Sequence, residues 1–146
     1  MQFHTSKFGT LEIDSQRIIL FPDGIVGFES HRHWVLLSED NDDSIGWLQS
    51  LSDGDLAFLV VTPQRFVEGY EMKLHRSQLL TVPWSREDRS LTLAIVSDHD
   101  GTLTANLKAP ILLNVDRCLG RQVIVADDQP LQHVLYTQPV PLRKSA

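Results

Sequence analysis

The sequence predicts an all-β protein, folded as a small antiparallel β-barrel-like single domain. Short apolar and β-branched runs recur along the chain, Pro and Gly separate them at turn-sized spacings, and patterns typical of helices are sparse. We expect about nine strands, which fit a barrel or a sandwich, and we favour the barrel. The domain is expected to span 1–146, with its core over about 9–127 and a flexible C-terminal tail over about 138–146.

Three strands are expected in the N-terminal half. Residues 17–21 are apolar and β-branched and stop at Pro22-Asp23-Gly24, which has the residues of a tight turn. Residues 34–37 form a second run, and the acidic segment 38–44 is expected to be the loop that ends it. Residues 56–61 are apolar almost without interruption, as in a strand covered on both faces. We therefore place this strand near the centre of the sheet.

Alternating patterns continue in the C-terminal half. Residues 70–75 alternate apolar and polar side chains, which predicts a half-buried strand. Residues 91–96 and 102–107 flank Asp100-Gly101, a dipeptide typical of a tight hairpin turn. The remaining expected strands are 111–115 and 122–125, and the helical candidates are short, at 46–51 and 76–80.

Charge and composition exclude several classes of function. Thirteen basic and nineteen acidic residues give a net charge of -6, which disfavours direct binding to nucleic acid. No apolar run approaches the roughly 20 residues that cross a bilayer, and residues 1–4 do not begin a secretory signal. The single Cys118 cannot form an intramolecular disulfide and fits a reducing compartment. We therefore expect a cytoplasmic protein without membrane contact, monomeric when alone because no heptad pattern is evident.

Catalytic and metal-binding motifs are almost absent. His31 and His33 would share a face if they lay on one strand, and with His4 or Glu29 they could bind a metal. A metal-dependent small-molecule enzyme is therefore the alternative hypothesis, although a polar strand edge explains the same histidines. An OB-like binder of single strands would need a basic groove, which the charge disfavours. Without a P-loop, a nucleotide-binding glycine motif or a cysteine pair, we expect no enzyme and no cofactor.

Four segments in a fixed order carry a family resemblance. They are Phe-Pro-Asp-Gly-Ile-Val-Gly-Phe-Glu at 21–29, Ile-Gly-Trp-Leu-Gln-Ser at 45–50, the apolar strand from 56 to 63, and Asn-Leu-Lys-Ala-Pro-Ile-Leu-Leu-Asn at 106–114. Arg117, Gly120 and Gln122-Val123-Ile124 follow the last of them. Together these segments resemble the signatures of the flagellar assembly factor FliW family over about 9–127. The match weakens at 127–133, which stands where the family usually has a Tyr and an Arg.

The resemblance implies a β-barrel-like fold without catalysis and two protein partners. One partner is flagellin, bound through its C-terminal segment. The other is the RNA-binding translational repressor CsrA, which the factor antagonises. Flagellin translation would thereby be coupled to flagellin supply.

Polar side chains within the signature segments are the candidate partner-binding residues. In strand-like runs they must either satisfy neighbouring backbone groups or face a partner, and both interpretations stay open. These residues are Gln49, Asn106, Lys108, Asn114 and Gln122. The other signature residues are expected to be structural, as positive-φ glycines, turn-setting prolines or core side chains. They are Phe21, Pro22, Gly24, Gly27, Phe28, Trp47, Leu48 and Pro110.

Overall fold

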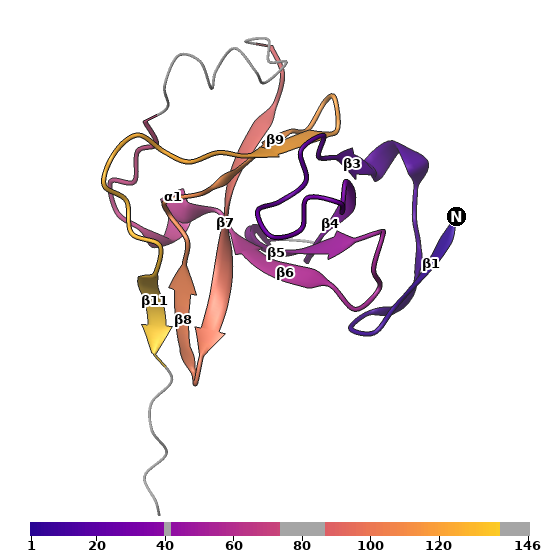
Figure 1. Ribbon diagram of the computed structural model, residues 1–146, viewed down its shortest axis with the longest axis horizontal. Coiled ribbons are helices and arrows are strands. Elements are labelled where there is room, and N and C mark those ends of the chain that lie inside the picture. Colours follow the sequence, from indigo (N-terminus) through magenta and orange to yellow (C-terminus); the bar gives the residue numbers. More distant parts are fainter. Residues whose placement is uncertain (40–41, 74–86, 138–146) are drawn as a thin grey trace, which may run out of the picture.

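The computed structural model describes residues 1–39, 42–73 and 87–137, and this part of the chain is almost entirely β-structure (Figure 1). Its helical segments are a single 3-10 turn at Ser15–Arg17 and α1 (Pro63–Phe66). No helix in these ranges is long and apolar enough to cross a membrane. The strands are β1 (Gln2–Thr5), β2 (Gly9–Glu12), β3 (Ile19–Leu20), β4 (His33–Glu39), β5 (Asp42–Ser50), β6 (Ala57–Val61), β7 (Ser90–His99), β8 (Thr102–Ala105), β9 (Ile111–Asn114), β10 (Leu119–Gln122) and β11 (His133–Thr137).

Seven of these strands close into a barrel in the order β3-β4-β5-β6-β7-β9-β10 and back to β3. The predicted all-β barrel is therefore confirmed. Six of the seven pairings are antiparallel, but β10 runs parallel to β3 and pairs with it through Leu119 and Leu20 alone. The expected antiparallel barrel is therefore mixed at this seam, because seven strands that pair antiparallel in succession leave the first and the last running in the same direction.

β7 belongs both to the barrel and to a second, smaller sheet. Residues 90–93 pair with β9, whereas residues 96–99 pair with β8, which in turn pairs with β11. Figure 1 shows β8 and β11 beside the far half of β7, away from β3–β6. The turn between β7 and β8 has φ of 53° at Asp100 and 90° at Gly101, as in the expected two-residue hairpin.

Two apolar cores hold these sheets. The barrel core contains Ile19, Phe21, Ile25, Trp34, Leu48, Val60, Leu93, Ile111 and Leu113. The second core lies between the smaller sheet and the segment that follows α1, and contains Val61, Tyr70, Ala94, Val96, Ala105 and Leu107. β6 contributes to both cores, because Val60 faces the barrel interior and Val61 the other side, as expected for a strand covered on both faces.

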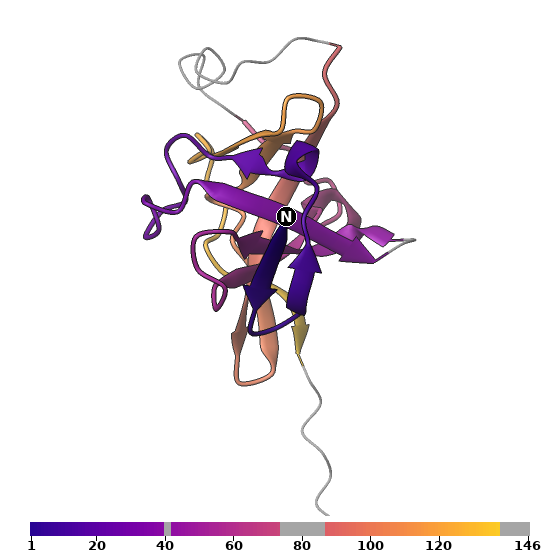
Figure 2. The same cartoon turned by 90° about the vertical axis from the view of Figure 1, so that its right-hand side faces the viewer.

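The N-terminal hairpin β1–β2 covers the outer face of β5. Figure 2, which looks from the side of the N-terminus, shows this hairpin in front of the barrel. The Phe8 ring packs edge-on against Trp47 at 5.9 Å, and Lys7 Nζ lies 3.9 Å from the centre of the Trp47 ring. Trp47 is therefore half-buried under the hairpin and does not reach the barrel core. Phe28 is also half-buried, whereas Phe21 and Leu48 are fully buried as expected.

Several expected elements differ from those observed. Residues 46–51 are mostly strand β5 rather than a helix, and β4 and β5 extend into the acidic segment 38–44 that was expected to be a loop. Residues 70–73 are not a strand, because Tyr70 and Met72 pack on the second core from a segment outside the sheet. Residues 74–75 of that expected strand and the helical candidate 76–80 lie outside the described residues.

The last expected strand is displaced towards the N-terminus. β10 ends at Gln122, whereas 122–125 was predicted. Val123 and Val125 remain extended and donate their backbone N–H groups to Pro110 O and Lys108 O, both at 3.0 Å. Val123 and Val125 are therefore buried although they lie outside the regular strand pairing of β10.

Candidate partner-binding site

The signature segment 21–29 folds into a compact loop that starts in the barrel core. Phe21 is fully buried, and its ring packs edge-on against Trp34 at 6.2 Å. Gly24 has φ of 66°, and a Cβ there would lie 2.5 Å from backbone atoms of Glu29. Only glycine fits this position without displacing the backbone. Pro22 is exposed, at the start of the turn.

The tip of this loop projects from the barrel. Ile25 and Phe28 form an isolated antiparallel bridge, and Gly27 between them has φ of 87°. The Gly27 N–H donates to Glu29 Oε1 at 3.1 Å, and this hydrogen bond lowers the pKa of Glu29. Val26 is consequently held outward with 68% of its surface exposed.

Gln122 joins the loop to the second half of the signature. Its Oε1 accepts the Val26 backbone N–H at 2.8 Å, and its Nε2 donates to Ala109 O at 3.0 Å. Both ends of the amide are thus occupied within the protein, although the side chain is only half-buried. Gln122 fixes the position of the loop tip relative to the start of β9.

Asn106 and Lys108 organise the turn that leads from β8 to β9. Asn106 Oδ1 accepts the N–H groups of Lys108 and Ala109 at 3.1 and 3.0 Å, an Asx turn, and buried Pro110 follows. Lys108 Nζ donates to Asp127 O at 2.7 Å. Both side chains therefore have structural hydrogen bonds while keeping part of their surface exposed.

Gln49 is fully buried at the end of β5. Its Nε2 lies 2.9 Å from Ser50 O and 3.0 Å from Leu56 O, and also contacts carbonyl oxygens of Asp53 and Gly54. The amide thus ties together the turn between β5 and β6. Of the two interpretations left open for Gln49, these contacts favour the structural one, because the side chain is not accessible in this structure.

Asn114 is also buried, with 1% of its surface exposed, which favours the structural interpretation for it too. Its Nδ2 donates to Asp88 Oδ2 at 2.9 Å, and its Oδ1 accepts the Arg117 N–H at 3.0 Å. Arg117 Nε forms an ion pair with the same Asp88 oxygen at 3.1 Å. Asn114 therefore fixes the turn after β9 against the residues that precede β7.

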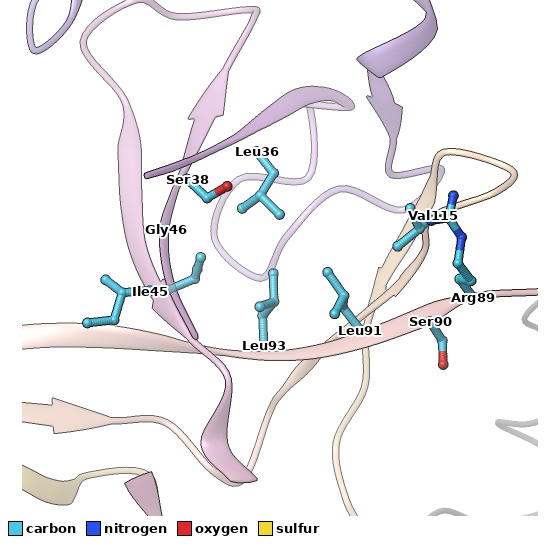
Figure 3. A pocket seen from close by; sticks show the side chains of 10 residues that line it. Leu36, Ser38, Ile45, Gly46, Arg89, Ser90, Leu91, Leu93 and Val115 are labelled. Carbon is cyan, nitrogen blue, oxygen red and sulfur yellow. The ribbon is translucent and has the colours of Figure 1, made fainter. Parts of the chain in front are cut away.

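The turn after β9 forms one rim of a pocket of about 480 Å³ at an open end of the barrel, here called the mouth pocket (Figure 3). Leu36 faces Leu91 and Leu93 across it. Gly46 on β5 adds no side chain, and a Cβ there would lie 2.9 Å from Leu37 O. The apolar lining residues are Leu36, Ile45, Val60, Leu91, Leu93 and Val115, and Ser38, Arg89 and Ser90 are polar.

A second hollow of about 330 Å³ adjoins the mouth pocket. It shares Leu36, Arg89, Leu91 and Val115 with it and extends towards Arg17 at the parallel seam of the barrel. Cys118 lies here, partly exposed rather than buried, with φ of 52°. The two hollows make the open end of the barrel a continuous recess.

Arg89 stands at the rim of the mouth pocket, beside Val115 (Figure 3). Its Nε donates to Asp116 Oδ1 at 3.0 Å and its backbone N–H to Asp116 Oδ2 at 2.8 Å. These hydrogen bonds, the backbone one first, lower the pKa of Asp116. Both carboxylate oxygens are thereby satisfied by one residue, and the two terminal nitrogens of the guanidinium have no hydrogen-bond partner among the described residues.

The histidine pair does not form a metal site. His31 precedes β4 rather than lying on it, so the two histidines do not share a strand face as the metal hypothesis required. His31 Nδ1 lies 3.2 Å from Ser50 Oγ, and the ring packs against Phe28 and Trp34. No group of three His, Cys, Asp or Glu side chains that could hold a metal ion occurs in the described ranges.

The residues of the mouth pocket were not among the predicted site residues. Ile45 was interpreted as part of the signature segment 45–50 and Val115 as the end of the expected strand 111–115, and Arg89 belonged to no recognised motif. The one available signal was that Val115 follows the polar Asn114 at the end of an apolar strand, where a turn would expose it.

Comparisons with known proteins agree with the fold and the signature segments. The family model described as FliW protein matches residues 2–135. A flagellar assembly factor FliW of Leptospira biflexa is 35% identical over 128 residues, covering 86% of this chain and 84% of the relative. One of Natranaerobius thermophilus is 31% identical over 140 residues, covering 93% of both chains.

A solved structure supports the same assignment. The crystal structure of a flagellar assembly factor FliW superposes with a TM-score of 0.85 at 30% identity, covering 96% of this chain and all of that one. Sequence and fold therefore agree over almost the whole described chain. The chain belongs to the FliW family of flagellar assembly factors, which is a non-enzymatic family.

Proposed function

We propose that this protein acts in the cytoplasm by binding the C-terminal segment of flagellin and by antagonising the RNA-binding repressor CsrA. Membership of the FliW family over residues 2–135 carries this proposal. Antagonism of CsrA releases flagellin translation, whereas free flagellin occupies the factor and restores repression. Flagellin supply thereby controls flagellin synthesis.

Two physical features support a protein-binding role. The open end of the barrel is lined mainly by aliphatic side chains, which can bury the apolar face of a partner segment. The net charge of -6 disfavours RNA close to the protein, as suits a factor that opposes an RNA-binding partner.

The switch requires that the two partners exclude each other. A disordered segment that folds onto a groove can bury a large surface and so block or reshape a second site. Coupling is reciprocal: if flagellin weakens CsrA binding by some factor, CsrA weakens flagellin binding by the same factor.

Titration of a flagellin C-terminal peptide into a preformed complex with CsrA tests this model. We expect release of CsrA on size-exclusion chromatography, and recovery of its RNA affinity in step. Co-elution of all three components at saturating peptide would contradict mutual exclusion and indicate two independent binding faces.

A further inference from the structure

We propose that the mouth pocket is the docking site for the C-terminal end of flagellin. An apolar side chain of that end inserts between Ile45 and Val115, and its terminal carboxylate pairs with Arg89. This inference rests on the proposed function and adds the site and the chemistry of recognition.

Two aliphatic side chains of the mouth pocket are left in contact with water. Ile45 and Val115 line the mouth pocket and are 41% and 38% exposed, although both are aliphatic. Burial of this surface by an inserted side chain releases ordered water and favours association. The volume of about 480 Å³ lies within the range of ligand pockets and accommodates a side chain of a peptide.

Arg89 places a positive charge at the rim of the mouth pocket. Asp116 accepts hydrogen bonds from the Nε and the backbone N–H of Arg89, while the Arg89 side chain is 78% exposed and its terminal nitrogens have no hydrogen-bond partner within the described residues. A planar guanidinium fork matches the geometry of a carboxylate. The end of a polypeptide carries a carboxylate directly beside its last side chains. A C-terminal segment therefore supplies both groups at the spacing of one or a few residues.

The edge strand β11 is a less suitable docking surface. Val134 and Tyr136 are 57% and 54% exposed there. The register with β8 shifts between these two residues, and such an irregularity disfavours the addition of another strand. Val134 thus provides a matched control, as an exposed valine outside the mouth pocket.

Fluorescence anisotropy with a synthetic flagellin C-terminal peptide, labelled at its N-terminus, tests the apolar contact. Val115→Glu and Ile45→Glu each place a charge in the pocket and should raise Kd roughly tenfold or more, whereas Val134→Glu should leave Kd unchanged. Thermal melting of each variant reports whether it is folded. If Val115→Glu does not fold, the peptide affinity of Ile45→Glu tests the apolar contact instead. Unchanged Kd for a folded mouth variant would overturn the proposal.

The carboxylate contact is tested with the same peptide in free-acid and amidated forms. Arg89→Gln should weaken binding of the free acid by roughly three- to tenfold, and amidation should weaken binding to the wild-type protein equally. Amidation should have no further effect on Arg89→Gln. Arg65→Gln, at an exposed arginine of α1, is the matched control.

The two levels of the proposal fail in different ways. If the wild-type protein does not bind the free-acid peptide at all, the proposed function is wrong. If it binds, but amidation and Arg89→Gln leave Kd unchanged, the proposed function stands and the docking site is wrong.

Discussion

The two ends of the barrel differ in how they are filled. At the end where β4 begins, the Trp34 ring stacks on Phe58 at 5.7 Å, and Phe58 packs edge-on against Phe28 at 5.3 Å. At the other end, aliphatic side chains surround the mouth pocket of about 480 Å³. The aromatic end is filled by its own side chains, whereas Ile45 and Val115 at the mouth remain partly exposed.

This difference originates in a few sequence positions. Aromatic residues occupy the closed end, while the mouth has Ser38, Gly46 and Ser90, whose side chains are small or absent. Close-packed aromatic rings stabilise the native state, and an unfilled pocket contributes little to it. Stability and partner binding should therefore separate when the two ends are mutated independently.

The largest expected effect is that of Trp34→Ala at the closed end. Trp34 is fully buried, packs on Phe21 and Phe58, and donates its Nε1–H to His31 O at 2.8 Å. Its truncation should lower the free energy of unfolding by about 3–5 kcal/mol. Urea denaturation followed by circular dichroism measures this loss.

Val115→Glu at the mouth is the matched comparison for stability. It should change the free energy of unfolding by less than about 0.5 kcal/mol, since surface substitutions seldom do more. A loss as large as that of Trp34→Ala would show that the mouth also supports the fold, and the contrast between the two ends would not hold.

The next largest effect is expected for Asn114→Ala. The substitution removes the hydrogen bond that Asn114 donates to Asp88 and the one that it accepts from the Arg117 N–H, and should destabilise the protein by about 1–3 kcal/mol. Because the turn at 114–118 forms one rim of the mouth, flagellin affinity should fall as well. Weaker binding without any decrease in melting temperature would favour direct contact with a partner instead.

Local sequence patterns were sufficient for the fold class and most strands. The 100–101 hairpin follows from backbone conformations that Asp and Gly adopt readily, and 56–61 follows from an uninterrupted apolar run. The N-terminal hairpin was not predicted, because its two strands have four residues each and only weak alternation. Residues 70–73 alternate as a strand does, yet Tyr70 and Met72 pack from outside the sheet.

Burial of the candidate site residues could not be predicted from the sequence. Gln49 alternates onto the outer face of β5, yet its amide is buried among the backbone carbonyl oxygens of the turn between β5 and β6. The mouth pocket depends on contacts between β4, β7 and β9, which are distant in the sequence. Recognition of the signature segments identified the family, but it did not distinguish residues that hold the turns from residues that face a partner.

A smaller effect is expected for Trp47→Ala, which tests the covered outer face. Trp47 is half-buried and contacts Phe8 and Lys7 of the N-terminal hairpin. Its truncation should cost about 1–2 kcal/mol, less than that of Trp34. Hydrogen exchange should increase chiefly in β1 and β2. Equal losses for the two tryptophans would mean that the hairpin is part of the cooperative core.

The smallest effects are expected at one carboxylate near each end, Asp116 at the mouth and Glu29 in the signature loop. Hydrogen bonds from Arg89 and from the Gly27 backbone N–H lower the pKa of Asp116 and Glu29, respectively. A carboxyl group with a lowered folded-state pKa stabilises the protein above its unfolded pKa, and this contribution is lost as the pH falls through the lowered value. Asp116→Asn and Glu29→Gln should therefore lower the melting temperature slightly at neutral pH, and each difference from the wild-type protein should shrink as the pH decreases below the ordinary pKa values of 3.8 and 4.5.

Peptide binding at neutral pH separates the two sites. Asp116→Asn weakens the hydrogen bonds that position Arg89 and should reduce flagellin affinity, whereas Glu29→Gln should not. Equal affinities for both variants would mean that Arg89 does not need Asp116 to present its guanidinium to a carboxylate.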